Sequence, residues 1–123
     1  MLLRDPSIRV LHNDSRVSLE DFCRREERSA RTVPFLARRY PQAGAAVSYA
    51  AVNAAISRAD TSGATARKLV KSGVAREPFL GLLRATIHGL ERIGVSDQLL
   101  KRSYATLAGL HIFRGYRASE GGR

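Results

Sequence analysis

The side chains in this sequence with the clearest chemistry are arginines, and their spacing favours phosphate binding. All but three of the 21 lysine and arginine residues are arginines. A guanidinium group pairs with phosphate through two hydrogen bonds and can also stack on a base. Arg24, Arg28 and Arg31 occur at i, i+4 and i+7, which places them along one face of a helix. We therefore predict that these three residues contact a nucleic-acid backbone.

Similar basic patterns recur further along the chain. Arg67, Lys68 and Lys71 share one face of a short predicted helix, with Leu69 and Val70 turned away from it. One charged helix face is usually a solvated face with exposed ion pairs, but its recurrence favours a surface that follows a strand. The predicted contacts outside the first helix are Arg38, Arg39, Arg67, Lys68, Lys71, Arg76, Lys101, Arg102 and Arg114.

The net charge supports the same interpretation for the whole chain. Eleven acidic residues oppose the 21 basic ones, which gives a formal charge of +10 and an isoelectric point near 11.0. Self-repulsion of this size destabilises a folded chain unless an anionic partner relieves it. Among the tyrosines, Tyr116 beside Arg114 and Arg117 is the candidate for base stacking. We therefore expect backbone contact to single-stranded RNA or DNA without base-specific recognition.

Residues that could support catalysis or bind a metal are scattered. His12, His88 and His111 have no partner at the spacing of a metal site or a catalytic triad, and we expect structural roles for them. Cys23 flanks the apolar face of the first helix and is expected to be a small buried hydrophobic residue. Residues 61–64 lack the second glycine and the Lys-Ser/Thr pair of a P-loop. The sequence predicts no enzyme, no cofactor and no metal site.

Apolar periodicity, capping residues and glycines predict an all-α protein, a compact bundle of five or six helices. Ser18 is the expected N-cap of the first helix, with Asp21 in the capping-box position, and Gly94 is an expected C-terminal stop. We predict a non-helical N-terminal arm over 1–17, one helical domain over 18–117 and a disordered tail over 118–123. The expected helices span about 19–31, 34–40, 42–59, 64–72, 79–93 and 97–115.

The composition is that of a globular domain outside the membrane. Hydrophobic residues make up 44% of the chain, enough for a modest core. No apolar run approaches the roughly 18 residues of a transmembrane helix, and the first residues lack the apolar region of a signal peptide. The expected location is the cytoplasm.

Two other classes of function remain open. Residues 90–100 are similar to the turn of a helix-turn-helix motif, with Gly94 followed by an apolar residue. In that case the chain would be a dimeric DNA-binding regulator that presents Lys101 and Arg102 to a groove. The third possibility is a basic protein-interaction module whose charge serves an acidic partner.

Size, helicity, alanine content and dispersed arginines together resemble the small helical subunit of multi-subunit (class 1) CRISPR surveillance complexes. The resemblance covers residues 18–117 and concerns the type of protein, without a diagnostic motif. It implies a non-catalytic subunit of a ribonucleoprotein complex that stacks with copies of itself in a filament and guides a strand along a positive groove. It further implies that the alanine-rich face around Ala46, Ala50 and Ala54 packs against a neighbour.

Overall fold

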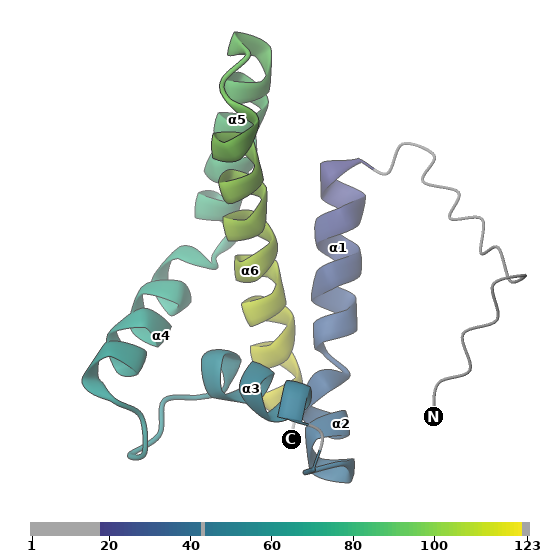
Figure 1. The fold of residues 1–123 in the computed structure, drawn as a ribbon, viewed down its shortest axis with the longest axis vertical. Helices are drawn as coiled ribbons and strands as arrows, with labels where there is room; N and C mark the ends of the chain where they lie inside the picture. The colour runs from purple at the N-terminus through teal and green to yellow at the C-terminus, as the bar shows by residue number, and fades with distance from the viewer. Residues whose placement is uncertain (1–17, 43, 122–123) are drawn as a thin grey trace, which may run out of the picture.

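The computed structural model describes residues 18–42 and 44–121, and every regular element in this part of the chain is an α-helix (Figure 1). The predicted all-α bundle is confirmed. The predicted N-terminal arm, 1–17, lies outside the described residues. The helices are α1 (Leu19–Ala30), α2 (Val33–Arg39), α3 (Gly44–Asn53), α4 (Ser62–Val74), α5 (Glu77–Ile93) and α6 (Asp97–Gly121).

Short-range sequence signals determine several helix ends. The Ser18 hydroxyl oxygen accepts a hydrogen bond from the backbone N–H of Asp21 at 3.1 Å, so α1 begins where its cap predicts. Thr61 caps α4 in the same way through the N–H of Ala64, at 3.2 Å. Gly94 ends α5 with φ 75°, in the left-handed region that glycine adopts without a steric cost.

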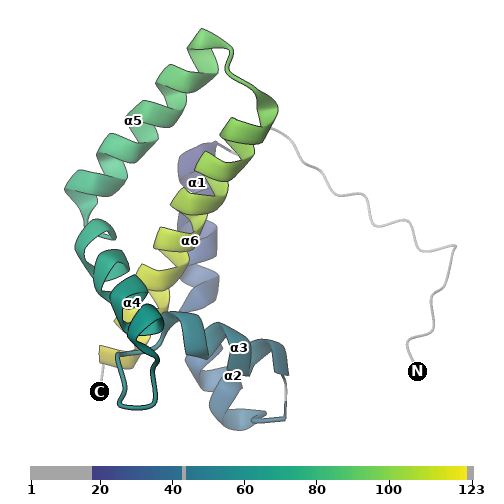
Figure 2. The ribbon, with the colours of Figure 1, turned by 60° about the vertical axis from the view of Figure 1, so that its left-hand side comes forward.

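The core lies where α1 and α5 pack against α6. In Figure 1, α1 and α6 run side by side in the same direction, and Figure 2 shows α5 meeting α6 at one end of the molecule. Cys23 is 1% exposed, which confirms the predicted small buried hydrophobic residue, and burial raises the pKa of its thiol. The buried apolar cluster consists of Cys23, Leu80, Ile87, Leu107 and Leu110.

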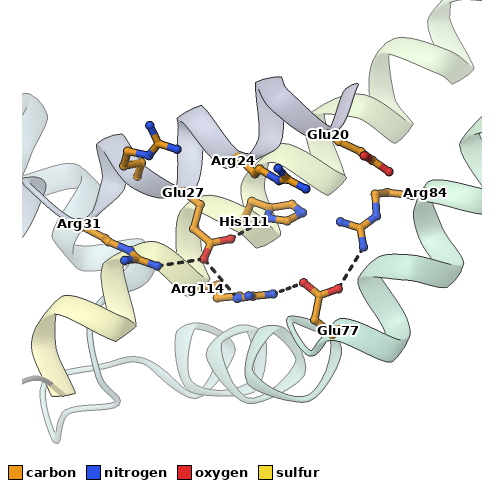
Figure 3. Close-up of a pocket in the computed structure, with 9 residues that line it drawn as sticks. Glu20, Arg24, Glu27, Arg31, Glu77, Arg84, His111 and Arg114 are labelled. Carbon is orange, nitrogen blue, oxygen red and sulfur yellow. Dashed lines mark hydrogen bonds and ion pairs between the residues drawn. The ribbon is translucent and has the colours of Figure 1, made fainter. Parts of the chain in front are cut away.

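Helices α1 and α6 approach each other closely at Gly115. A Cβ atom at this position would overlap the carbonyl oxygen of Glu27 and lie 2.9 Å from its carbonyl carbon. Gly115 is buried, so the absence of a side chain is what lets the two backbones meet. The contact brings Glu27 of α1 level with His111 and Arg114 of α6 (Figure 3).

Helix α3 ends at Asn53 and is shorter than the predicted helix over 42–59, and side chains then pair with the backbone beyond and near its end. The side-chain amide of Asn53 is buried and donates to a backbone carbonyl one turn earlier, at 3.0 Å. The next free N–H, that of Ala55, donates to the Glu120 carboxylate of α6 at 3.1 Å. Ala54, which the resemblance places on a packing face of this helix, therefore lies beyond its end.

Helix α6 is longer than predicted and continues to Gly121. Its C-terminal half buries apolar side chains: Phe113 is 4% and Tyr116 3% exposed, and α6 contacts α2, α3 and α4. This burial offsets the cost of ordering the segment. Residues 118–121, predicted as part of a disordered tail, are helical, whereas 122–123 lie outside the described residues.

Candidate functional site

A polar cavity of about 500 Å³ opens between α1, α5 and α6 (Figure 3). The three arginines predicted from their spacing on α1 line it, together with one arginine from each of the other two helices. Five arginines against three glutamates leave a formal charge of +2 when the single histidine is neutral. The lining residues are Glu20, Arg24, Glu27, Arg28, Arg31, Glu77, Arg84, His111 and Arg114.

Glu27 connects α1 to α6 within this cavity. It is 9% exposed, and its carboxylate oxygens lie 2.9 Å from His111 Nδ1, 3.3 Å from Arg114 Nε and 3.5 Å from Arg31 Nη2. A nearly buried carboxylate is tolerated because these charged donors replace the water it has lost.

Glu77 of α5 makes a second bridge across the cavity. Its carboxylate lies 2.6 Å from Arg114 Nη1 and 3.0 Å from Arg84 Nη2. The hydrogen bond from Arg114, followed by that from Arg84, lowers the pKa of Glu77, and the same bond raises the pKa of Arg114. The two glutamates thereby hold Arg31, Arg84 and Arg114 in fixed positions around the cavity.

His111 is buried, at 3% exposure, and one of its ring nitrogens is unpaired. Because the ionised carboxylate of Glu27 only accepts hydrogen bonds, His111 Nδ1 donates to it. His111 Nε2 has no hydrogen-bond partner within the described part of the chain. Figure 3 shows the ring with Glu27 on one side and Arg84 on the other. The partner of His111 is 84 residues away in the sequence, so the spacing of residues along the chain could not reveal this pair.

Arg24 and Arg28 are the two cavity arginines with no acidic partner within 4.0 Å among the described residues. Both are exposed. The predicted residues Arg38 and Arg39 are exposed on α2, which follows α1 directly and continues beyond its end (Figure 1). Arg24 and Arg28 form a basic edge of the cavity, and Arg38 and Arg39 lie on the next helix, outside its lining.

The other exposed residues that were predicted as nucleic-acid contacts lie away from this cavity. Arg67 is on α4, which Figure 1 shows on the side of α6 away from α1. Arg76 precedes α5 as its N-cap residue. Lys101 and Arg102 lie in the first turns of α6, at the end of the molecule where α5 meets α6. The fold therefore does not bring all predicted contacts together.

In helix α4 the buried face is not the predicted one. Lys68 is 4% exposed, and its Nζ lies 2.9 Å from both carboxylate oxygens of Asp60. Leu69 and Val70 are 58% and 64% exposed. The prediction that Lys68 contacts nucleic acid was wrong, because Asp60 in the preceding loop supplies a buried partner while the aliphatic stem of Lys68 packs in the interior.

Two other residues that the sequence predicts as nucleic-acid contacts, Tyr116 and Lys71, are buried and half-buried. Tyr116 is 3% exposed, so the prediction that it stacks on a base was wrong. Lys71 is half-buried, with its Nζ 5.6 Å from the centre of the Phe113 ring. Burial, and then repulsion by Arg67 and Lys68, lowers the pKa of Lys71.

Helical spacing of arginines does not reveal the other residues that hold the cavity together, namely Glu27, Glu77, Arg84 and His111. One signal was present. Cys23, Glu27 and Ala30 occur at i, i+4 and i+7, and all three are buried. A carboxylate on the same stripe as a cysteine and an alanine indicates a buried partner on another helix.

The described residues contain no group of three or more His, Cys, Asp or Glu side chains that could hold a metal ion. None of the described helices combines the length and apolar character needed to span a bilayer. The chain matches no protein-family model, no curated protein and no solved structure.

Proposed function

We propose that this chain is a non-catalytic protein that binds single-stranded nucleic acid through the phosphate backbone. The supporting observation is that Arg24 and Arg28 are exposed and lack acidic partners among the described residues, beside a cavity of formal charge +2. The neighbouring arginines are already fixed by ion pairs. Arg24 and Arg28 therefore keep their guanidinium donors available for phosphate.

Helix α2 provides features that favour a single strand over a duplex. Phe35 is 62% and Tyr40 50% exposed, and they flank Arg38 and Arg39 in the sequence. Exposed aromatic rings beside arginines suit the stacking of unpaired bases, which a duplex does not offer. Stacking of this kind depends little on sequence, which agrees with backbone binding without base-specific contacts.

The composition of the cavity favours binding over catalysis. Its two bridging carboxylates, Glu27 and Glu77, are engaged by arginines and by His111, whereas Arg24 and Arg28 keep donors free for an anion. The resemblance to CRISPR small subunits extends the proposal to assembly, in which copies of the chain would guide one strand within a larger complex.

The test compares two charge-matched double variants by fluorescence anisotropy with a single strand of mixed sequence at several salt concentrations. Arg24→Gln/Arg28→Gln removes two charges from the basic edge. Lys101→Gln/Arg102→Gln removes two charges from the far end of the molecule. Loss of two phosphate contacts flattens the slope of log affinity against log salt by about 1.4, at roughly 0.7 for each contact with a single strand.

The proposal expects that flattening in the first variant and an unchanged slope in the second. Equal effects of the two variants would mean that net charge alone drives binding, and would refute a defined interface on α1. Selective loss of duplex binding in Lys101→Gln/Arg102→Gln would instead favour the helix-turn-helix regulator. Circular dichroism of both variants verifies that helicity is retained.

A second candidate function, binding to an acidic protein, is favoured by an apolar groove between α4, α5 and α6. Two adjoining hollows of about 520 and 330 Å³ share Val74, Thr106 and Leu110. Arg67 and Lys71 lie on one rim, so an apolar segment with acidic flanks would be complementary. Leu82 lines the smaller hollow. If no strand binds at low salt, affinity capture of an acidic protein by the native chain, and not by Leu82→Lys, would support this function.

A further inference from the structure

We propose that the cavity between α1, α5 and α6 binds a phosphate monoester, the group found at the end of a nucleic-acid strand. Its assignment to a strand end rests on the proposed function, whereas the monoester chemistry rests on the cavity itself. The three features that support it are the charge of the lining, the unoccupied donors of its arginines and the unpaired nitrogen of His111.

Charge and size fit a monoester better than an internal phosphodiester. The formal charge of the lining is +2 with neutral His111. A phosphate monoester carries a charge of about −1.5 to −2 at neutral pH, whereas each internal phosphodiester carries a single negative charge. The volume of about 500 Å³ lies within the roughly 300–1,000 Å³ of small-ligand pockets, which leaves room for the sugar that bears the phosphate.

Donors remain available on arginines of two helices. Arg24 and Arg28 make no ion pair within the described residues. The Arg84 side chain, 23% exposed, uses Nη2 on Glu77 at 3.0 Å, and its other donors stay unassigned. A phosphate between α1 and α5 would thus meet guanidinium groups from both sides, two of which are free to close on it.

His111 adds an unsatisfied group in the same lining. With its Nδ1 donating to Glu27, the neutral ring has Nε2 as an acceptor, and this nitrogen is buried with no partner among the described residues. Once the side chains that cover Nε2 move aside, a monoester in its singly charged form can donate its P–O–H to this nitrogen. An internal phosphodiester has no such proton to share.

The experiment compares strands that differ only at one end. Fluorescently labelled single strands with a 5′-phosphate, a 3′-phosphate or hydroxyl ends are titrated at low salt. We expect about tenfold tighter binding of one phosphorylated form, the effect of one to two charge-assisted hydrogen bonds. Calorimetry with a nucleoside 5′-monophosphate and with inorganic phosphate tests whether a free small molecule is the source of the group.

Two cavity variants and one control connect the preference to these residues. His111→Asn keeps an amide donor near Nδ1 for Glu27 but removes Nε2, and Arg84→Gln removes a guanidinium that lines the cavity from α5. Both are expected to abolish the preference for the phosphorylated end. Arg25→Gln changes the same charge on α1, outside the lining, and is expected to retain it. Thermal unfolding identifies any variant that fails to fold, in which case the other cavity variant decides.

The outcomes separate this inference from the proposed function. Equal affinity for phosphorylated and hydroxyl ends, with no binding of the nucleoside monophosphate, overturns the monoester site and leaves backbone binding intact. No binding of any strand overturns the proposed function, and the monoester site then stands only if the nucleoside monophosphate binds. Tight binding of that small molecule with equal affinity for all strand ends supports the chemistry and identifies a free nucleotide as its source.

Discussion

Gly115 shows how much of the site depends on a single missing side chain. In an ordinary helix, replacement of glycine by alanine stabilises the fold by about 0.5–1 kcal/mol. In Gly115→Ala the new Cβ would overlap the Glu27 carbonyl, so α1 and α6 must separate. We expect a loss of about 1–3 kcal/mol in the free energy of unfolding, the range for overpacking a closed interior. Urea denaturation measures it.

Gly109→Ala on the same helix is the matched control. A Cβ at Gly109 meets no atom within 4 Å, so this variant should be slightly more stable than the native protein. If both alanine variants stabilise the chain, the close approach of α1 and α6 is incorrect. If Gly115→Ala alone is destabilised, it should also weaken phosphate binding, because Glu27, His111 and Arg114 shift relative to one another.

The buried pair of Lys68 and Asp60 supports a second prediction. Lys68 lowers the pKa of the Asp60 carboxyl through a side-chain hydrogen bond, and the N–H of Ser57 adds to this. Because the folded pKa lies below the unfolded one, the stabilisation is complete above the unfolded value of about 4 and is lost as pH falls through the folded value. Asp60→Asn leaves Lys68 charged and buried without its partner.

Thermal unfolding as a function of pH measures this effect. We expect Asp60→Asn to lower the Tm at neutral pH by more than the exposed substitution Asp97→Asn. The difference between native protein and Asp60→Asn should shrink on acidification, because both then lack a carboxylate at this position. A gap that stays constant down to low pH would show that the ion pair does not provide the stabilisation.

Single residues also show where sequence reasoning succeeds. The spacing of Arg24, Arg28 and Arg31 was sufficient to place them together, since a helix fixes the positions of residues that are close in sequence. The contact of Glu27 with His111 spans 84 residues and depends on the packing of α1 against α6. No local pattern specifies such a pair, although the position of Glu27 on a buried stripe indicates that some partner exists.

At the scale of elements, the sequence predicts where helices begin and end better than it predicts which helix face is buried. Ser18 and Gly94 act locally, and their helix ends confirm the prediction. The orientation of α4 depends on its packing: the predicted exposed face contains Lys68, which the structure buries, while Leu69 is exposed. A small protein with many alanines has little large apolar surface, so one buried ion pair can reverse the face of a short helix.

The orientation of α4 gives a third prediction. Leu69→Gln replaces an exposed side chain and should change the free energy of unfolding by less than about 0.5 kcal/mol. Val74→Gln, on the same helix, places an amide at a partly buried position packed on the core cluster and should cost about 1–3 kcal/mol. Chemical denaturation of the two variants decides the orientation: a larger loss for Leu69→Gln would restore the face predicted from the sequence.

At the scale of the whole molecule, the charge of +10 affects binding and stability in opposite ways. Salt weakens binding to a phosphate chain because the favourable free energy of releasing condensed counterions falls as the salt concentration rises. The same salt screens the repulsion among basic residues spread over α1, α2, α4 and α6. The ion pairs of Arg25, Arg84 and Arg117 are exposed or half-exposed. Such pairs contribute little to stability. Repulsion should therefore dominate the salt dependence of folding.

We accordingly expect the Tm of the free protein to rise as ionic strength increases from about 0.01 to 0.15 M, while the Debye length falls from about 30 to 8 Å. Lys101→Glu/Arg102→Glu lowers the formal charge from +10 to +6, two units for each substitution, at positions away from the cavity. This variant should be more stable than the native chain at low salt and show a flatter rise. A native Tm that falls with salt would mean that the ion pairs of Glu27 and Glu77 outweigh the repulsion, and the basic edge would then be stable without an anionic partner.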